Sequence, residues 1–213
     1  MPRAKVVELA PRDKILDAAQ ELFAKRGFAG VGLSEIAEVV GLGKSSLFHH
    51  FHSKAELYAA VAGRILAHLE TVLTRALAAG GTPTERFDRW LETLVQTLAA
   101  HPSYSRLLLR GLFEDDELTG ELDEERAANQ TLARIVESVA VLLREGMASG
   151  EFRHASIPHT LQSLIGLIVY HFASGDFGTE LTGRPLFAPT EVRRRLEEIK
   201  SLLHHGLLQG AKS

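Results

Sequence analysis

Apolar residues recur at spacings of three and four along almost the whole chain, which is the periodicity of an amphipathic helix. No segment alternates clearly between apolar and polar residues, so no strand is predicted and we expect an all-α protein. Glycine and proline residues divide the pattern into separate helices. The expected helices are about 12–25, two short segments within 32–51, 54–79, 83–100, 102–112, a segment ending at 149, 158–173 and 189–208, with a loop at 174–188.

Two helix starts carry the signature of a capping box, in which side chains three residues apart satisfy each other's free N–H groups. Ser53 and Glu56 have this spacing in one case, and Thr82 and Glu85 have it in the other. Gly150 is expected to end the helix before it, because glycine readily adopts the left-handed conformation found after helix C-termini.

The segment 32–51 has the pattern of a helix-turn-helix motif, in which two short helices meet at a tight turn. The turn falls at residues 41–43, which are Gly-Leu-Gly. The apolar positions of the two helices are Ile36, Ala37, Val40, Leu47 and Phe51. In such a motif the second helix lies in the DNA major groove. Its outer side here carries Lys44, Ser45, Ser46, His49 and His50.

The first quarter of the chain contains a longer set of ordered motifs around this segment. They are Ala18-Ala19, Leu22-Phe23, Gly27-Phe28, Ile36-Ala37, Gly41, Leu47-Phe48 and the run from Phe51 to Leu57. With these motifs, the segment from Ile15 to Val61 resembles the DNA-binding region of the TetR family of transcriptional regulators. It departs from the usual family pattern at Val31 and Gly32, where hydroxyl residues are common, and at Phe48, where tyrosine is common.

The resemblance implies a two-part organisation. An N-terminal three-helix helix-turn-helix head, residues 1–53, would bind DNA. A larger helical body, residues 54–213, would bind an effector and form the dimer. The helix at 54–79 would contact both parts, because its start lies beside the head and its end lies in the body.

Seven residues are expected at the DNA. They are Lys44, Ser45, Ser46, Phe48, His49, His50 and Lys54. Lys44 would reach guanine or phosphate, and Phe48 would either touch a thymine methyl group or pack within the protein. Lys54 would hold phosphate beside a helix N-terminus. The two histidines are either DNA contacts or exposed residues; a metal site that also uses His52 is a weaker alternative, because adjacent histidines on a helix diverge.

The distribution of charge supports a DNA-binding head, although the formal net charge of the chain is −3. Residues 1–54 hold eight Lys/Arg and six Asp/Glu, or +2, whereas the remainder holds sixteen and twenty-one, or −5. The first eleven residues are either disordered or an arm that reaches DNA. The acidic stretch at 114–125 is expected to be a solvated loop and a first helical turn, with a metal site as the weaker alternative.

Cysteine is absent, and no N-terminal segment resembles a signal peptide. The longest apolar run, residues 164–170, is far shorter than the roughly 20 residues needed to cross a bilayer. We therefore expect a cytoplasmic protein without a membrane segment. No cofactor and no metal are predicted.

A homodimer is expected, because one recognition helix reads few base pairs and a palindromic operator needs two of them about 34–36 Å apart. The helix at 158–173 is apolar all round, and the helix at 189–208 has an apolar stripe. These two helices would form a four-helix bundle with their copies. The alternative is that both are core helices of a monomer. The resemblance favours the dimer, because family members pair through their last two long helices.

The body contains a mixture of aromatic and polar residues that is typical of small-molecule pockets. The candidates for ligand binding are Trp90, His101, Tyr104, Phe113, Tyr170 and His171. Ordinary core packing is the alternative for each of them. The mixture favours an apolar or aromatic effector. The resemblance implies that effector binding lowers DNA affinity through the helix at 54–79.

The sequence therefore predicts a sequence-specific transcriptional regulator, most simply a homodimeric repressor that a small-molecule effector releases from its operator. A ligand-independent DNA-binding dimer and an activator remain alternatives. An all-helical enzyme is the least favoured, because the chain has no cysteine, no HExxH motif, no glycine-rich phosphate loop and no nucleophile elbow.

Overall fold

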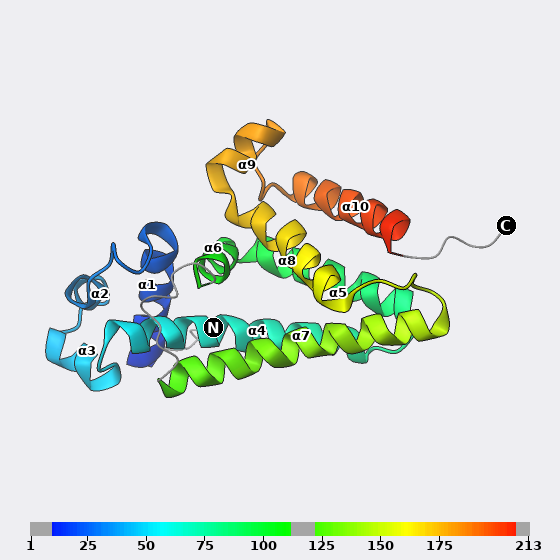
Figure 1. Cartoon of the computed structure of the whole chain (residues 1–213). Coiled ribbons are helices and arrows are strands. Elements are labelled where there is room, and N and C mark those ends of the chain that lie inside the picture. The colour runs from blue at the N-terminus through cyan, green and yellow to red at the C-terminus, as the bar shows by residue number, and fades with distance from the viewer. Residues whose placement is uncertain (1–9, 112–121, 208–213) are drawn as a thin grey trace, which may run out of the picture.

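The computed structural model describes residues 10–111 and 122–207, which form ten α-helices (Figure 1). They are α1 Pro11–Arg26, α2 Leu33–Val39, α3 Lys44–His50, α4 Lys54–Ala78, α5 Pro83–Ala100, α6 Pro102–Gly111, α7 Asp123–Ser149, α8 Ile157–Ala173, α9 Gly175–Thr182 and α10 Pro189–Gly206. The prediction of an all-α fold with an N-terminal helix-turn-helix is confirmed. Phe113, nearly all of the N-terminal arm and most of the acidic stretch lie outside the described residues.

The first three helices lie at one end of the molecule, and α4 leads from them along the body (Figure 1). At the start of α4, Ser53 Oγ accepts a hydrogen bond from the N–H of Glu56 at 3.0 Å. The Glu56 carboxylate accepts from the N–H of His52 at 2.7 Å, so this capping box is only half formed. The box at Thr82 and Glu85 is complete and begins α5.

The helices α4 and α7 lie side by side and run in the same direction along the body (Figure 1). Small residues allow a close approach, since a Cβ at Gly63 would lie 3.8 Å from the Cβ of Ala128. Arg134 of α7 donates from Nε to Glu70 of α4 at 2.5 Å. Exposed pairs of this kind contribute little. The burial of apolar side chains along one continuous core, from α1 to α10, supplies most of the stability.

The C-terminal helices cover one side of this core. α8 crosses above α4 and α7, and α10 packs against α5 (Figure 1). His204 of α10 and Asp88 of α5 are 2.8 Å apart at Nε2 and Oδ1. Gly150 ends α7 with φ +79°, as expected. Within the described residues, no helix combines the length and hydrophobicity that a membrane crossing requires.

The prediction of a loop throughout 174–188 is wrong, because α9 occupies Gly175–Thr182. Glycines at both ends and in the middle disfavour a helix by local propensity. Gly178 is nevertheless buried, and a Cβ at this position would clash with Ser174 Oγ and lie 2.8 Å from Leu186 Cδ1. The missing side chain therefore permits close packing, and tertiary contacts outweigh the local preference.

Candidate DNA-binding and ligand-binding sites

Buried side chains anchor the helix-turn-helix motif. Ile36 of α2, Leu47 of α3 and Phe51 after α3 are fully buried, and Val40 packs partly against the same core. The turn places Gly41 at φ +68°, a left-handed conformation that glycine adopts without strain. The apolar positions of the predicted motif therefore fix how α3 is presented.

These anchors leave the predicted DNA-binding side chains of α3 on its outer side. Lys44, Ser45, Ser46, Phe48 and His49 are exposed, and His50 is half-buried. The ammonium of Lys44 lies over the ring of Phe48, 5.8 Å from its centroid. The rings of His49 and His50 are 5.8 Å apart and nearly perpendicular to one another. The structure thus gathers six of the seven predicted residues on one short helix.

The seventh residue, Lys54, lies at the first position of α4 and has contacts within the protein. Its Nζ donates to the carbonyl of Phe28 at 3.0 Å and lies 4.1 Å from the centroid of the Phe28 ring. A lysine ammonium has three donors, so two remain for other partners. Lys54 therefore ties α4 to the turn after α1 and still carries charge at a helix N-terminus.

Three further residues bear on the predicted DNA surface. The guanidinium of Arg12 lies over the ring of Phe51, 5.0 Å from its centroid, so it adds a positive charge beside α3. The sequence pattern did not predict this contact, because Arg12 and Phe51 are far apart along the chain. Val31 is buried in the core, so its side chain is unavailable for a phosphate contact, and Gly32 caps α2 without a side-chain hydrogen bond.

Hydrogen bonds connect α1 with α4 and α6. Arg64 of α4 donates to Asp17 Oδ1 at 2.6 Å and to Gln20 Oε1 at 2.9 Å. Gln20 in turn donates from Nε2 to Ser103 Oγ of α6 at 2.9 Å. The side chain of Ser103 is buried. This chain of contacts links the first helix to two helices of the body.

Two predicted ligand residues, His101 and Tyr104, belong to a polar cluster beside this link. Tyr104 Oη is 2.9 Å from His68 Nδ1, and the His101 ring stacks on the Tyr104 ring with centroids 4.6 Å apart. Burial and the neighbouring His68 lower the pKa of His101, and burial raises the pKa of Tyr104. These side chains pair with each other and do not line the apolar cavity of the body.

That cavity, of about 190 Å³, lies between α4, α5, α6, α7 and α8. Trp90, a predicted ligand residue, forms part of its wall with Leu69, Leu73, Val139 and Leu164, all of them buried. The Trp90 Nε1–H is buried and has no hydrogen-bond partner among the described residues. The mouth of the cavity lies between α7 and α8, where Leu132 is 37% exposed and Ile165 is 40% exposed.

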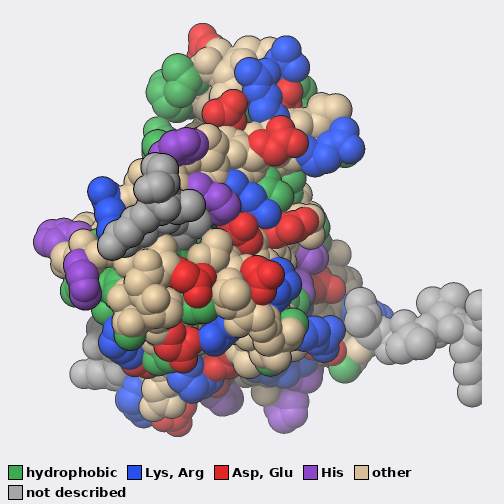
Figure 2. All heavy atoms as spheres, turned by 90° about the vertical axis from the view of Figure 1, so that its right-hand side faces the viewer, with side chains coloured by type: hydrophobic (Ala, Val, Ile, Leu, Met, Phe, Trp, Pro, Cys, Tyr) green, Lys and Arg blue, Asp and Glu red, His purple; other side chains and the backbone are tan. Residues whose placement is uncertain are grey.

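Tyr170 and His171 line a different hollow, of about 480 Å³, between α8, α9 and α10. His171 is half-buried, and burial, with the nearby charge of Arg195, lowers its pKa to about 4. Arg195 donates to the carbonyl of Leu167 at 2.7 Å. Figure 2 shows the α9 region as a lobe above the rest of the body that carries hydrophobic side chains and charges of both signs.

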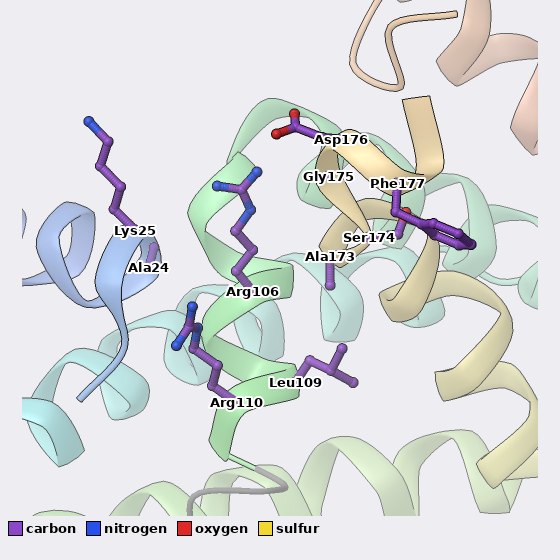
Figure 3. Close-up of a pocket in the computed structure, with 10 residues that line it drawn as sticks. All are labelled: Ala24, Lys25, Arg106, Leu109, Arg110, Ala173, Ser174, Gly175, Asp176 and Phe177. Atoms are coloured by element: carbon purple, nitrogen blue, oxygen red, sulfur yellow. The ribbon is translucent and has the colours of Figure 1, made fainter. Parts of the chain in front are cut away.

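A third hollow, of about 550 Å³, lies where α1 approaches α6 and the junction of α8 and α9. Figure 3 shows Lys25 on α1, Arg106 and Arg110 on α6, and Asp176 at the start of α9, with Arg106 extending into the space between Lys25 and Asp176. Its walls are charged, unlike those of the apolar cavity. None of the predicted ligand residues within the described ranges lines it. Within 10–111 and 122–207, no group of three His, Asp or Glu side chains could hold a metal ion.

A helix-turn-helix beside the N-terminus, joined by a long helix to a body with an internal cavity, defines a DNA-binding regulator. A sequence profile described as "Bacterial regulatory proteins, tetR family" matches residues 15–61. A second profile, "Tetracyclin repressor-like, C-terminal domain", matches residues 83–202. The chain belongs to the TetR family. It is a DNA-binding transcriptional regulator, and proteins of this family are not enzymes.

Individual relatives agree with this assignment. The transcriptional regulator RutR of Escherichia coli (strain K12) is 25% identical over 206 residues, which cover 93% of this chain and 91% of RutR. The transcriptional repressor KstR of Mycolicibacterium smegmatis is 29% identical over 113 residues, which cover 53% of this chain and only 55% of KstR. The structure of the ketosteroid transcriptional regulator KstR2 of Mycobacterium tuberculosis has a TM-score of 0.76 at 15% identity, covering 95% of this chain and 97% of KstR2. At that identity the likeness shows the fold.

Proposed function

We propose that this regulator is a homodimeric repressor that binds a palindromic operator and is released from it by a small apolar molecule. The observation that carries the proposal is the exposed polar side of α3, held in place by buried Leu47 and Phe51. The second helix of such a motif enters the major groove. In this proposal residues 1–53 form the DNA-binding domain, and residues 54–213 form the effector-binding and dimerisation domain.

The proposed DNA contacts divide into base contacts and phosphate contacts. Base edges in the major groove would be read by Lys44, Ser45, Ser46, His49 and His50, with Phe48 at a thymine methyl group. Lys54 would hold phosphate with its two remaining donors and the free N–H groups at the start of α4. Arg12, beside Phe51, would add a second phosphate contact.

The proposed dimer pairs α8 and α10 of one protomer with the same helices of its partner. Large apolar side chains are exposed on both helices: Tyr170 of α8 is 51% exposed and Leu202 of α10 is 61% exposed. On the neighbouring α9, Phe177 is 58% exposed and Leu181 75%. Clustered exposed apolar residues favour a protein interface. Two paired helices from each protomer would make the four-helix bundle that such a surface requires.

The proposed effector site is the apolar cavity that Trp90 lines. Its walls include α4, which begins at the DNA-binding head, and α6, which is hydrogen-bonded to α1 through Gln20 and Ser103. A ligand that alters the packing of these helices would change the separation of the two recognition helices and lower DNA affinity. The description of KstR2 as a ketosteroid regulator supports an apolar effector.

The test is a gel shift of the purified protein on the DNA that flanks its own gene, at fixed salt and with nonspecific competitor. We expect a discrete band that disappears when the palindrome is scrambled. Ser46→Ala should change the preferred bases more than the overall affinity, whereas Thr74→Ala, an exposed threonine near the far end of α4, should change neither. Retardation that competitor abolishes at every sequence tested would contradict the proposal.

A further inference from the structure

The charged hollow between the head and the body gathers positive side chains from two helices. Lys25 belongs to α1, and Arg106 and Arg110 belong to α6 (Figure 3). Asp176 of α9 is the one carboxylate among the described residues that line the hollow. Residues 55–213 as a whole have the opposite balance, with sixteen Lys/Arg against twenty-one Asp/Glu. A concave surface lined mainly by one sign of charge attracts ions of the other sign, so this hollow is suited to an anion.

Arg106 is the central cation of the hollow. Its guanidinium extends into the space between Lys25 and Asp176 (Figure 3). It forms no ion pair with Asp176 and no hydrogen bond with any other described residue. Arg64, which also lies where the head meets the body, is by contrast paired with Asp17 at 2.6 Å. A guanidinium offers five donors in a planar fork that fits the oxygens of a phosphate group, and those of Arg106 are available to a ligand.

The surrounding structure holds Arg106 in a defined place. The residue is half-buried on α6, and α6 is fixed to α1 by the hydrogen bond between Gln20 and Ser103. Gly175, at φ +57°, makes room for the guanidinium, because a Cβ at this position would lie only 3.0 Å from Nη2 of Arg106. The cation is therefore confined by three helices, α1, α6 and α9, and differs in this from an arginine on an open surface.

The size and walls of the hollow indicate what kind of anion it accepts. Its volume of about 550 Å³ lies within the roughly 300–1,000 Å³ of small-molecule pockets, so it has room for more than a bare ion. Leu109, Ala173 and Phe177 supply apolar wall. A phosphate monoester carries about −1.5 to −2 charges at pH 7 and three acceptor oxygens. Such a group can meet cations on two helices at once, and an attached organic part can lie on the apolar wall.

We propose that this hollow binds the phosphate group of a small organic molecule, with Arg106 as the main contact and Lys25 as the second. The bound anion ties α1 of the head to α6 of the body. The site is separate from the apolar cavity, since Leu109 lines the hollow whereas its neighbour Leu108 lines the cavity. The inference goes beyond the proposed function, because it requires neither the operator nor the apolar effector.

The test compares phenyl phosphate with phenyl sulfate by calorimetry. The two probes have nearly the same shape, and the sulfate ester carries only one negative charge. Ionic strength is held constant, because salt screens exposed charges. Phenyl phosphate should bind the wild-type protein with a Kd below about 1 mM. Phenyl sulfate should bind roughly three- to tenfold more weakly, because one charge fewer faces the cations.

Variants of the lining residues locate the binding. Arg106→Gln should weaken phenyl phosphate about tenfold, as expected for a charge-assisted hydrogen bond. Arg106→Lys should lose less, because it keeps the charge without the planar fork. Lys25→Gln, at an exposed position where folding is not at risk, should weaken binding about threefold. Asp176→Asn should strengthen binding, since it removes the opposing carboxylate. Arg75→Gln, an exposed arginine on α4, is the matched control and should change nothing.

Amide hydrogen exchange tests whether the anion ties the two helices together. Phenyl phosphate should slow exchange in α1 and α6 of the wild-type protein, because a ligand that bridges them suppresses local opening. The same addition to Arg106→Gln should have little effect. Exchange that is unchanged in the wild-type protein at saturating phenyl phosphate would refute the bridge.

The backbone of DNA is another source of phosphate, and operator binding distinguishes the two sources. Arg106→Gln should leave the salt slope of operator binding unchanged. A slope lower by about one unit would assign the cation to DNA and overturn the inference. A Kd above about 1 mM, equal binding of the two probes, or equal affinities of Arg106→Gln and Arg75→Gln would also overturn it. The calorimetry contains no DNA, so it decides the ligand class even for a protein that binds no operator.

Discussion

The head and the body use buried side chains for different purposes. In the head, buried residues such as Leu47 and Phe51 support α3, and the groups proposed to meet DNA lie outside on that helix. In the body, buried residues such as Leu69 and Val139 are themselves the walls of the proposed site. One region presents its site on a packed core, and the other encloses its site within the core.

This difference determines how stability and function are related. Exposed residues away from special contacts change stability by less than about 0.5 kcal/mol, so the head can vary its DNA contacts at small cost. Substitutions in a cavity wall change packing and ligand fit together. Substitutions of exposed residues in the head should therefore change DNA binding without changing stability. Substitutions in the cavity wall of the body should change stability and ligand binding together.

The largest effect is expected from removing the support of the recognition helix. Leu47→Ala should reduce the free energy of unfolding by about 2–5 kcal/mol, the range for a truncated buried leucine, and abolish operator binding. Urea unfolding and the gel shift measure the two effects. The matched control is Ser45→Ala on the same helix, which should keep full stability. A loss below about 1 kcal/mol for Leu47→Ala would mean that the head does not depend on this anchor.

Leu69→Ala examines the body in the same way. It should reduce the free energy of unfolding by about 2–4 kcal/mol and enlarge the cavity. Unlike the head variant, it should keep operator binding and gain affinity for a two-ring probe such as naphthalene. Urea unfolding, the gel shift and calorimetry measure these outcomes, with Val39→Ala at an exposed head position as control. An unchanged affinity for naphthalene would show that Leu69 does not limit the cavity.

At Lys54, the first residue of α4 beside the head, one substitution should change stability and DNA binding together. Lys54→Ala should lower the salt slope of operator binding by about one unit, as expected for one phosphate contact. It should also reduce stability by about 1 kcal/mol, because Nζ loses its hydrogen bond to the Phe28 carbonyl. Arg75→Ala, an exposed cation near the far end of α4, is the control. A slope that matches the wild type would remove Lys54 from the phosphate contacts.

The smallest effect concerns pH and His171 in the body. Its pKa is about 4 in the folded protein and about 6.5 when unfolded. Between these values the unfolded chain binds a proton that the folded chain does not, so stability falls as the pH is lowered from about 6.5 towards 4. The side chain is partly exposed, and screening by solvent limits the effect to less than about 1 kcal/mol.

Urea unfolding at pH 7 and pH 5 measures this dependence. His171→Gln should lose less stability than the wild type between the two pH values, because the variant has no group to protonate at this position. His154→Gln, at an exposed position after α7, should behave like the wild type. Equal pH dependence in all three proteins would exclude His171 as a source of it.

The head could be predicted from the sequence because its site lies in one contiguous segment. Once the apolar positions Ile36, Leu47 and Phe51 identify two helices and a turn, the helical period places residues 44–50 around α3. The described structure agrees with that placement. Arg12 was missed, because its contact with the Phe51 ring depends on how α1 packs, and no local pattern encodes this.

The body could be predicted only as a set of helices. Its cavity takes walls from five of them, and among the predicted ligand residues described here only Trp90 lines it. His101 and Tyr104 were selected for their polar groups, which the structure uses in contacts between α4 and α6. A cavity is a defect in packing, and composition does not show where side chains fail to fill space.

The continuity of α4 has a geometric consequence. Leu73 in the cavity wall lies 73 − 54 = 19 residues from Lys54, a separation of about 28 Å at about 1.5 Å per residue. A rotation of about 7° around the cavity end would move the other end by about 3.5 Å. Successive base pairs are about 3.4 Å apart. Under the proposed function, a few degrees at one end of this helix would equal one base pair at the other, so a small molecule in the cavity would shift the register in which the protein meets its operator.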